Sequence, residues 1–363
     1  MRARLRNVRA ALAGLAAAVA IALASAHAGA APTLPSRLSD QEFWKLVTDL
    51  SETGGSFRSE NLLSNEMRLQ YVIPDLMRTV HGGAYLGVGP EQNFTYIAAV
   101  QPSIAFIVDI RRGNLLLQLM YKALFELSND RVEFVSRLFS RRAPEGLAAS
   151  ASVTQLFDAI DASEPSEMLY DRTLKAIDAQ LVMKHGFALS AEDLGGIEHV
   201  FHAFYTFGPA INYSSSENEP PTTTGNYRPT YAELMTATDS DGHERSYLAS
   251  EAAFAQVKAM QTKNLVVPVV GDFAGSRALR AVGAYLRSHS ATVSAFYVSN
   301  VEQYLRVERN WGSFCGNAAR LPIDESSMFI RAGRGGRYAR GGTALTHELT
   351  QMTADLDGCD RRP

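Results

Sequence analysis

The chain is poor in cysteine and has no excess of positive charge. Its 363 residues include two cysteines, 35 Lys and Arg, and 38 Asp and Glu, for a net charge of −3. Two cysteines exclude a cysteine-rich zinc module and a dense disulfide scaffold. The charge balance gives no support to nucleic-acid binding. With 46% hydrophobic and 20% charged residues, the composition is that of a globular protein with a sizeable core.

Several catalytic signatures are also missing. There is no Walker-type phosphate loop, and the segment 271–275 has Phe273 where a G-x-S-x-G nucleophile elbow needs serine. His347-Glu348 lacks the second histidine of the zinc-protease motif. His199 and His202 lie three residues apart, but their apolar neighbours predict a buried helix, so we expect no metal.

The N-terminus has the layout of a secretory signal peptide, which we assign to residues 1–30. An apolar run (10–24) and a small-residue stretch (25–30) follow four basic residues, Arg2, Arg4, Arg6 and Arg9. The apolar run is shorter than the ~20 residues of a membrane span. We therefore expect export to the periplasm with no stable span after cleavage, and a membrane anchor if the leader is uncleaved. Without the four arginines the net charge becomes −7.

Export would place Cys315 and Cys359 in an oxidising compartment, where a disulfide persists. A bridge would tie the Gly- and Arg-rich C-terminal tail (333–363) to the body of the protein. Two unpaired thiols, one buried and one near the terminus, are the alternative.

Residues 31–80 are expected to form an N-terminal helical segment. Asp40 is placed to cap a helix that extends to Leu50, and Gly54-Gly55 ends the pattern. A second helix is expected over 66–77, interrupted at Pro74.

An α/β pattern begins at residue 81. Residues 84–89 and 104–109 are continuous apolar runs, as in strands buried on both faces of a parallel sheet. Helices are expected over 90–99 and 115–127, so the region 81–128 forms a β-α-β-α unit.

The alternation of strands and helices resumes over 263–332, after a helical insertion (129–262). We expect strands at 265–270, 292–299 and 328–330 and a helix at 276–287; Pro268 weakens the first of these strands. The insertion contains a polar loop, 214–228, which fits either a lid or a surface excursion. The sequence thus predicts one α/β sheet interrupted by helices.

Polar residues at the predicted strand ends suggest a ligand site. Gly87 and Gly89 follow the first strand and precede a helix, where glycine allows the backbone to approach a ligand. Asp109 ends the next strand, at a position where a carboxylate accepts ribose hydroxyls. Asp272 and the segment 299–304 end two further strands on the same edge. A structural turn with a satisfied carboxylate is the alternative explanation.

These motifs resemble the Rossmann-type S-adenosylmethionine-dependent methyltransferases. The resemblance is closer to an uncharacterised bacterial family of methyltransferase-like proteins, which brings no established reaction. It is carried by the segments 85–98, 108–112, 121–125, 270–275 and 296–302.

The resemblance implies roles for individual residues in binding S-adenosylmethionine. Gly87 and Gly89 would lie under the methionine moiety, in a loop that includes Glu91 and Asn93, and Asp109 would hold the ribose. Asp272 and Phe273 would flank the adenine. The candidates on the side of the methyl acceptor are Asn300, Glu302 and Tyr304.

Two functions follow as hypotheses. The first is a methyltransferase-like enzyme with an unknown acceptor. The second is an exported, non-catalytic protein that binds a small molecule in the same crevice. A vestigial crevice in a structural protein is a third, weaker possibility. Oligomeric state is not predicted.

Overall fold

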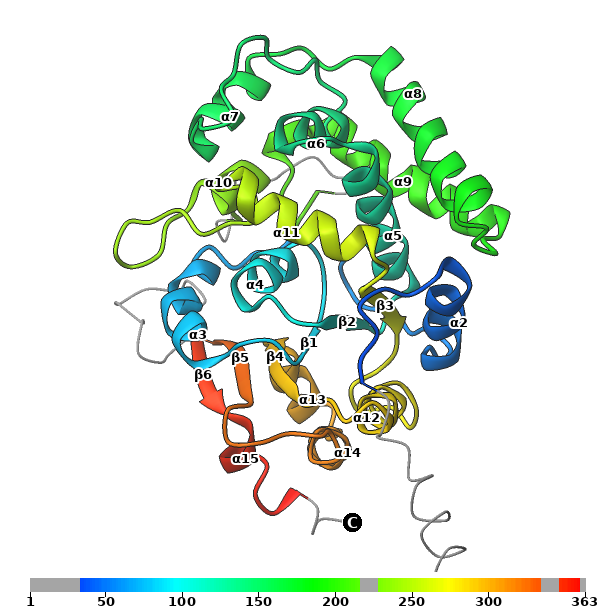
Figure 1. The fold of residues 1–363 in the computed structure, drawn as a ribbon, viewed down its shortest axis with the longest axis vertical. Helices are drawn as coiled ribbons and strands as arrows, with labels where there is room; N and C mark the ends of the chain where they lie inside the picture. The colour runs from blue at the N-terminus through cyan, green and yellow to red at the C-terminus, as the bar shows by residue number, and fades with distance from the viewer. Residues whose placement is uncertain (1–32, 216–227, 334–345, 360–363) are drawn as a thin grey trace, which may run out of the picture.

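The structure is a computed structural model that describes residues 33–215, 228–333 and 346–359 (Figure 1). The expected signal peptide, most of the loop 214–228 and part of the expected tail lie outside the described residues.

The centre of the protein is one six-stranded sheet of order β3-β2-β1-β4-β5-β6. The first five strands in this order run parallel, and β6 pairs antiparallel with β5. The expected α/β class with a mostly parallel sheet is therefore confirmed. The strands are β1 (Ala84–Gly87), β2 (Ile104–Asp109), β3 (Val266–Val270), β4 (Val293–Ser299), β5 (Met328–Gly333) and β6 (Thr346–Gln351).

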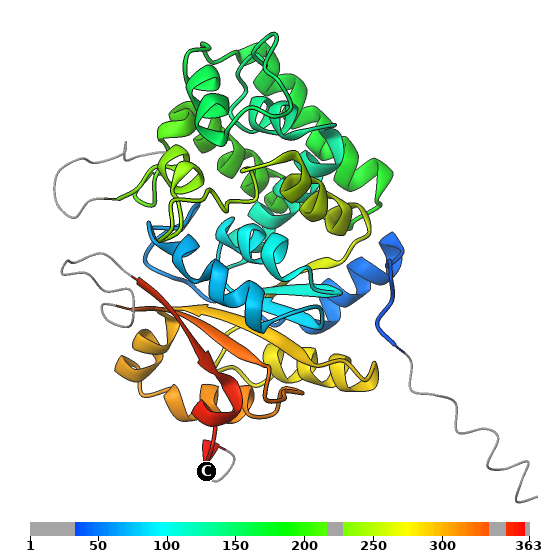
Figure 2. The same cartoon turned by 60° about the vertical axis from the view of Figure 1, so that its left-hand side comes forward.

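Helices cover both faces of the sheet, which explains why every residue of β1, β2 and β3 is buried (Figures 1 and 2). One face carries α4 (Gln92–Val100), α5 (Arg112–Leu127) and α11 (Glu251–Thr262); the other carries α12 (Ala278–Ser288), α13 (Val301–Val307) and α14 (Trp311–Ala318).

A further layer of helices packs on α5, above the sheet in Figure 2. It is formed by the chain between β2 and β3, and an aromatic cluster joins it to the sheet layer. Phe125 of α5 lies 4.5 Å from Phe134, and Tyr121 of α5 lies 6.0 Å from Phe204, ring centre to ring centre; Phe134 and Phe204 belong to the added layer. The helices are α6 (Arg131–Leu138), α7 (Val153–Asp161), α8 (Glu167–Asp178), the π-helix η2 (Ala179–Lys184), α9 (Ala191–Phe207), the 3₁₀ helix η3 (Gly208–Ala210) and α10 (Tyr231–Thr236).

The N-terminal helices differ from the expectation in detail. Helix α2 (Asp40–Leu50) is capped by Ser39, not Asp40, because the Ser39 hydroxyl and Glu42 form a reciprocal capping box. The predicted helix 66–77 is confirmed in part: residues 51–68 are not helical, and the 3₁₀ turn η1 (Leu69–Val72) leads directly into α3 (Ile73–Thr79). Pro74 occupies the first turn of α3, where its missing N–H costs nothing.

Pro268 is compatible with its strand because β3 lies at the edge of the sheet. It is paired in register with Ile107 of β2 on one side only. A proline is tolerated on an edge strand, since its missing donor can face away from the ladder.

The expected C-terminal tail contains the edge strand β6 and the short helix α15 (Met352–Asp355). Strand β6 has a single aliphatic residue, Leu349, so no hydrophobic alternation marked it in the sequence. The disulfide between Cys315 and Cys359, with Cα atoms 5.2 Å apart, is present and ties this region to α14. The disulfide is therefore confirmed over the alternative of two unpaired thiols.

Candidate functional site

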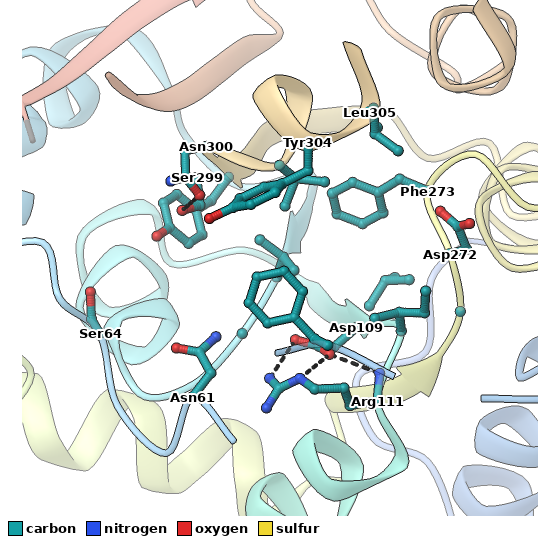
Figure 3. Close-up of a pocket in the computed structure, with 18 of the residues that line it drawn as sticks. Asn61, Ser64, Asp109, Arg111, Asp272, Phe273, Ser299, Asn300, Tyr304 and Leu305 are labelled. Carbon is teal, nitrogen blue, oxygen red and sulfur yellow. Dashed lines mark hydrogen bonds and ion pairs between the residues drawn. The ribbon is translucent and has the colours of Figure 1, made fainter. Parts of the chain in front are cut away.

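A pocket lies at the carboxyl ends of β1, β2, β3 and β4 (Figure 3). Strands β2 and β4 lie on opposite sides of β1, so the order of the strands reverses direction at this point. Ligands of open α/β sheets bind at such a topological switch point. Of the residues expected to bind a cofactor, Gly89, Asp109, Asp272 and Phe273 line this pocket.

Gly87 and Asn93 shape the loop after β1 but do not line the pocket. A Cβ on Gly87 would lie 1.9 Å from Oδ1 of Asn93, so the glycine makes room for a side chain of the protein itself. The Asn93 amide nitrogen donates to the carbonyls of Val88, Gly89 and Pro90, and its oxygen accepts from Tyr85. Asn93 therefore fixes the turn from within.

Glu91 also lies beneath the pocket, fully buried at the N-terminal boundary of α4. Its Oε1 accepts a hydrogen bond from the Ser64 backbone N–H at 3.2 Å, and Oε2 has no partner among the described residues. Burial raises the pKa of Glu91 to about 8. The side chain is thus a neutral acid at pH 7.

Asp109 ends β2 and is held by its neighbour Arg111. Nε and Nη2 of Arg111 donate to the two carboxylate oxygens at 3.0 and 2.9 Å, and the Arg111 backbone N–H donates at 2.9 Å (Figure 3). Asp109 as a whole residue is only 5% exposed. Two of these hydrogen bonds end on Oδ1 and one on Oδ2. Oδ2 can therefore accept a further hydrogen bond from a ligand.

Asp272 and Phe273 follow β3. One Asp272 oxygen accepts from the backbone N–H of Ala274 at 2.8 Å, which fixes the turn. Phe273 is 3% exposed and packs against Phe296 and Phe314, with ring centres 5.1 and 5.8 Å away. Figure 3 shows both residues on the same wall of the pocket.

Two of the three catalytic candidates line the pocket, and one does not. Asn300 and Tyr304 border it, on the turn into α13 and on that helix. Glu302 is turned to β5, where its carboxylate accepts from Nε and Nη2 of Arg331 at 2.7 and 3.0 Å. It is therefore part of a structural ion pair in this conformation.

The segment 56–66 forms another wall of the pocket, although none of its residues was predicted to bind a ligand. Phe57 contacts Tyr304 edge to face at 5.3 Å, and Arg58 donates to the Tyr304 hydroxyl at 2.7 Å. The glycines before it, treated in the sequence as a helix break, were the available signal. A Cβ on Gly55 would lie 2.7 Å from the side chain of Ile110, so this close approach to the end of β2 requires glycine.

Glu66 closes the inner end of the pocket, where it meets β4 and β6. Oε1 accepts from Ser299 at 2.5 Å, and Oε2 accepts from Tyr297 at 2.5 Å and from Nε2 of His347 at 2.7 Å. Burial acts to raise the pKa of Glu66, but the charge of His347 and these hydrogen bonds outweigh it, so the pKa lies below its ordinary value.

Residues 33–215, 228–333 and 346–359 contain no group of three or more His, Cys, Asp or Glu arranged to hold a metal ion. Within those ranges no helix combines the length and apolar character needed to cross a bilayer.

The chain matches the family described as a domain of unknown function (DUF7790) over residues 62–185 and 218–357, more than half of its length. The protein belongs to this family. Both matched ranges contribute to the pocket, the first with Glu66 and Asp109 and the second with Asp272 and Ser299. No curated protein matches the sequence.

Proposed function

We propose that the DUF7790 pocket binds an adenosyl-type ligand, with S-adenosylmethionine as the first candidate, and that the protein is methyltransferase-like. The observation that carries the proposal is the convergence of Gly89, Asp109 and Asp272-Phe273 on one pocket, from the ends of three adjacent strands.

The sheet supports a Rossmann-like assignment. Its strand order, numbered along the chain, is 3-2-1-4-5-6, which is the order of dinucleotide-binding sheets. The pocket occupies the crevice that this topology creates beside the first strand. The antiparallel sixth strand distinguishes this sheet from an all-parallel one.

The side chains in the pocket suit the parts of an adenosyl ligand. Asp109 offers carboxylate oxygens to ribose hydroxyls, and Asp272 offers one to an amino group. Phe57 and Phe273 supply aromatic surface for a purine. Gly89, with φ of +78°, leaves its backbone accessible to the ligand.

In this proposal the protein's contribution to the reaction is positioning. S-adenosylmethionine supplies a methyl group already activated on a sulfonium. Asn300 and Tyr304 would orient an acceptor, and the segment 56–66 would exclude water. Gly87, Glu91 and Asn93 would act indirectly, by fixing the loop that carries Gly89.

We further propose that the protein is exported to the periplasm. The Cys315–Cys359 disulfide supports this location, because structural disulfides persist in oxidising compartments. Export would require the cofactor to be supplied outside the cytoplasm, or the pocket to serve another small molecule.

Titration of the full chain with S-adenosylmethionine and S-adenosylhomocysteine, followed by calorimetry and melting temperature, tests the proposal. A ligand at 100 times its Kd stabilises the fold by about 2.7 kcal/mol. Asp109→Asn is expected to weaken binding at least tenfold, because it removes the charge that strengthens the ribose hydrogen bonds.

Asp193→Asn is the matched control. Asp193 forms the same two-point contact with an arginine, Arg112, at 2.6 and 2.7 Å, but lies outside the pocket. The Asp193→Asn variant should bind S-adenosylmethionine and S-adenosylhomocysteine with the same affinity as the unmodified protein. Absence of binding by either ligand would overturn the adenosyl assignment and leave the exported, non-catalytic small-molecule-binding protein as the working hypothesis.

A further inference from the structure

Ser299 has an unusual backbone conformation at the inner end of the pocket. Its φ is +50°, in the left-handed region that a serine rarely occupies. It is the last residue of β4, two residues before the start of α13, and its side chain borders the pocket (Figure 3). Backbone strain of this kind costs about 1–3 kcal/mol and concentrates at functional sites.

The conformation resembles the strand-to-helix turn that presents a nucleophilic serine in hydrolases. The G-x-S-x-G pentapeptide of that turn is absent here, since Tyr297 and Val301 stand where its glycines would be. The geometry is therefore present without the sequence signature.

A carboxylate lies within hydrogen-bond reach of the Ser299 hydroxyl. Ser299 Oγ donates to Oε1 of Glu66 at 2.5 Å, a short contact that places the carboxylate in direct reach of the hydroxyl proton, as the base of a nucleophile must be. Glu66 is 2% exposed, and its other oxygen is held by Tyr297 and His347, each of which is fully buried. Tyr297 and His347 thus fix the orientation of the carboxylate and keep it ionised, so that it can accept a proton from Ser299.

The buried Glu66–His347 ion pair is not explained by stability alone, because desolvation of both charges offsets their attraction. This favours a functional role for the pair. Glu66 and His347 come from segments 281 residues apart and meet directly under Ser299. We propose that Ser299 is a nucleophile for acyl transfer, with Glu66 as its base, and that the substrate is a small carboxylic ester.

The proposed reaction has two balanced halves. Ser299 Oγ forms a bond to the ester carbonyl carbon as its proton passes to Oε1 of Glu66. The carbonyl electron pair moves to oxygen and then returns, breaking the bond to the alkoxy group, which takes the proton from Glu66 and leaves as an alcohol. Water repeats the sequence on the acyl-serine, giving its proton to Glu66; Ser299 recovers a proton as the carboxylic acid leaves.

The pocket offers surroundings that suit this chemistry. The carboxamide of Asn61 points toward the pocket from the side opposite Ser299 and has no hydrogen-bond partner among the described residues, so it is available to a polar group of the substrate (Figure 3). Phe57 and Tyr304 provide an apolar wall for the acyl or alkoxy group.

Diisopropyl fluorophosphate is the probe for the test, because it reacts with activated serine hydroxyls. The full chain is treated with the reagent, and the adduct is located by peptide mass spectrometry. We expect one adduct, on Ser299, that is lost in Ser299→Ala and forms at least tenfold more slowly in Glu66→Gln.

Ser290 is the internal control. It has nearly the same left-handed φ, +52°, and is exposed, but no described carboxylate accepts its hydroxyl. No adduct at Ser299, equal labelling of Ser290, or an unchanged rate in Glu66→Gln overturns the proposal. If Glu66→Gln does not fold, the position of the adduct in the unmodified protein still decides. Labelling requires no adenosyl ligand, so its failure and that of the proposed function are separate results.

Discussion

Asp109 and Arg111 form a two-point ion pair across the end of β2, with both carboxylate oxygens engaged by one guanidinium. The aspartate is 6% exposed and the arginine 11% exposed at the side chain. The carboxylate expected to bind a ribose is thus already paired with an arginine of its own chain, and it keeps its negative charge. It can serve a ligand and the fold at once.

This pairing predicts that Arg111→Met destabilises the protein by about 3 kcal/mol, because Asp109 would remain buried without a countercharge. Urea denaturation measures the loss. The control is Lys45→Met, because both partners of the Lys45–Asp49 ion pair are exposed, to 71% and 56% of their side chains. That substitution should cost less than about 1 kcal/mol. Equal losses would mean that burial of the Asp109 pair has no energetic effect.

Glu91 predicts a pH dependence of stability. Its pKa is raised to about 8 from an ordinary 4.5 by burial. Between these values the folded protein keeps a proton that the unfolded chain has lost, so stability falls as pH rises. Glu91→Gln removes this pH-dependent contribution to stability. The free energy of unfolding of the variant minus that of the unmodified protein should therefore increase by roughly 4 kcal/mol from pH 4.5 to pH 8.

Urea titrations at several pH values between 4.5 and 8 give this difference. Glu42→Gln is the comparison, since hydrogen bonds from Ser39 lower the pKa of Glu42. Glu42 is ionised in both the folded and unfolded chains above pH 5.5, so its difference should stay constant from there to pH 8. A Glu91→Gln difference that does not grow with pH would show that Glu91 is ionised in the folded protein.

The surroundings of two glycines, Gly87 at the end of β1 and Gly113 in α5, predict opposite outcomes for their replacement by alanine. Gly87→Ala places a methyl group against Asn93 and Tyr85 and should cost about 2–3 kcal/mol through overpacking. Gly113, in α5, has no atom within 4 Å of its ideal Cβ. Gly113→Ala should therefore raise stability, by up to about 1 kcal/mol, because alanine favours the helix more than glycine does. Thermal unfolding of both variants decides; a tolerated Gly87→Ala would show that the loop adjusts.

The disulfide predicts redox-dependent stability. Cys315 and Cys359 enclose a sequence separation of 44 residues, and closing such a loop contributes about 4 kcal/mol on an entropic estimate. A Cys315→Ser/Cys359→Ser variant should lose that amount and should no longer respond to reductant. An unmodified protein whose melting temperature is the same with and without reductant would contradict this prediction.

The sheet was predictable where strands are continuous apolar runs. Residues 104–109 and 265–270 are apolar along most of their length because both faces of these strands are covered. Strand β6 was not predictable in the same way. Its backbone pairing with β5 and its link through the disulfide stabilise it, and neither leaves a hydrophobic period in the sequence.

The site was predictable only in part. Gly89, Asp109 and Asp272 follow apolar strands, so their common edge could be inferred from a parallel sheet. Glu91 and Asn93 were equally prominent in the sequence, yet their side chains turn inward to support the loop. A motif gives the position of a residue along the chain, and packing decides the direction of its side chain.

By itself, the sequence determined the α/β class, the positions of five strands and the edge at which their polar ends meet. These properties depend on local hydrophobic period and on chain direction. Only the tertiary structure decided that segment 56–66 forms a wall of the pocket and that Glu66, Ser299 and His347 meet beneath it. Contacts between such distant residues arise from the packing of separate elements, which no local pattern encodes.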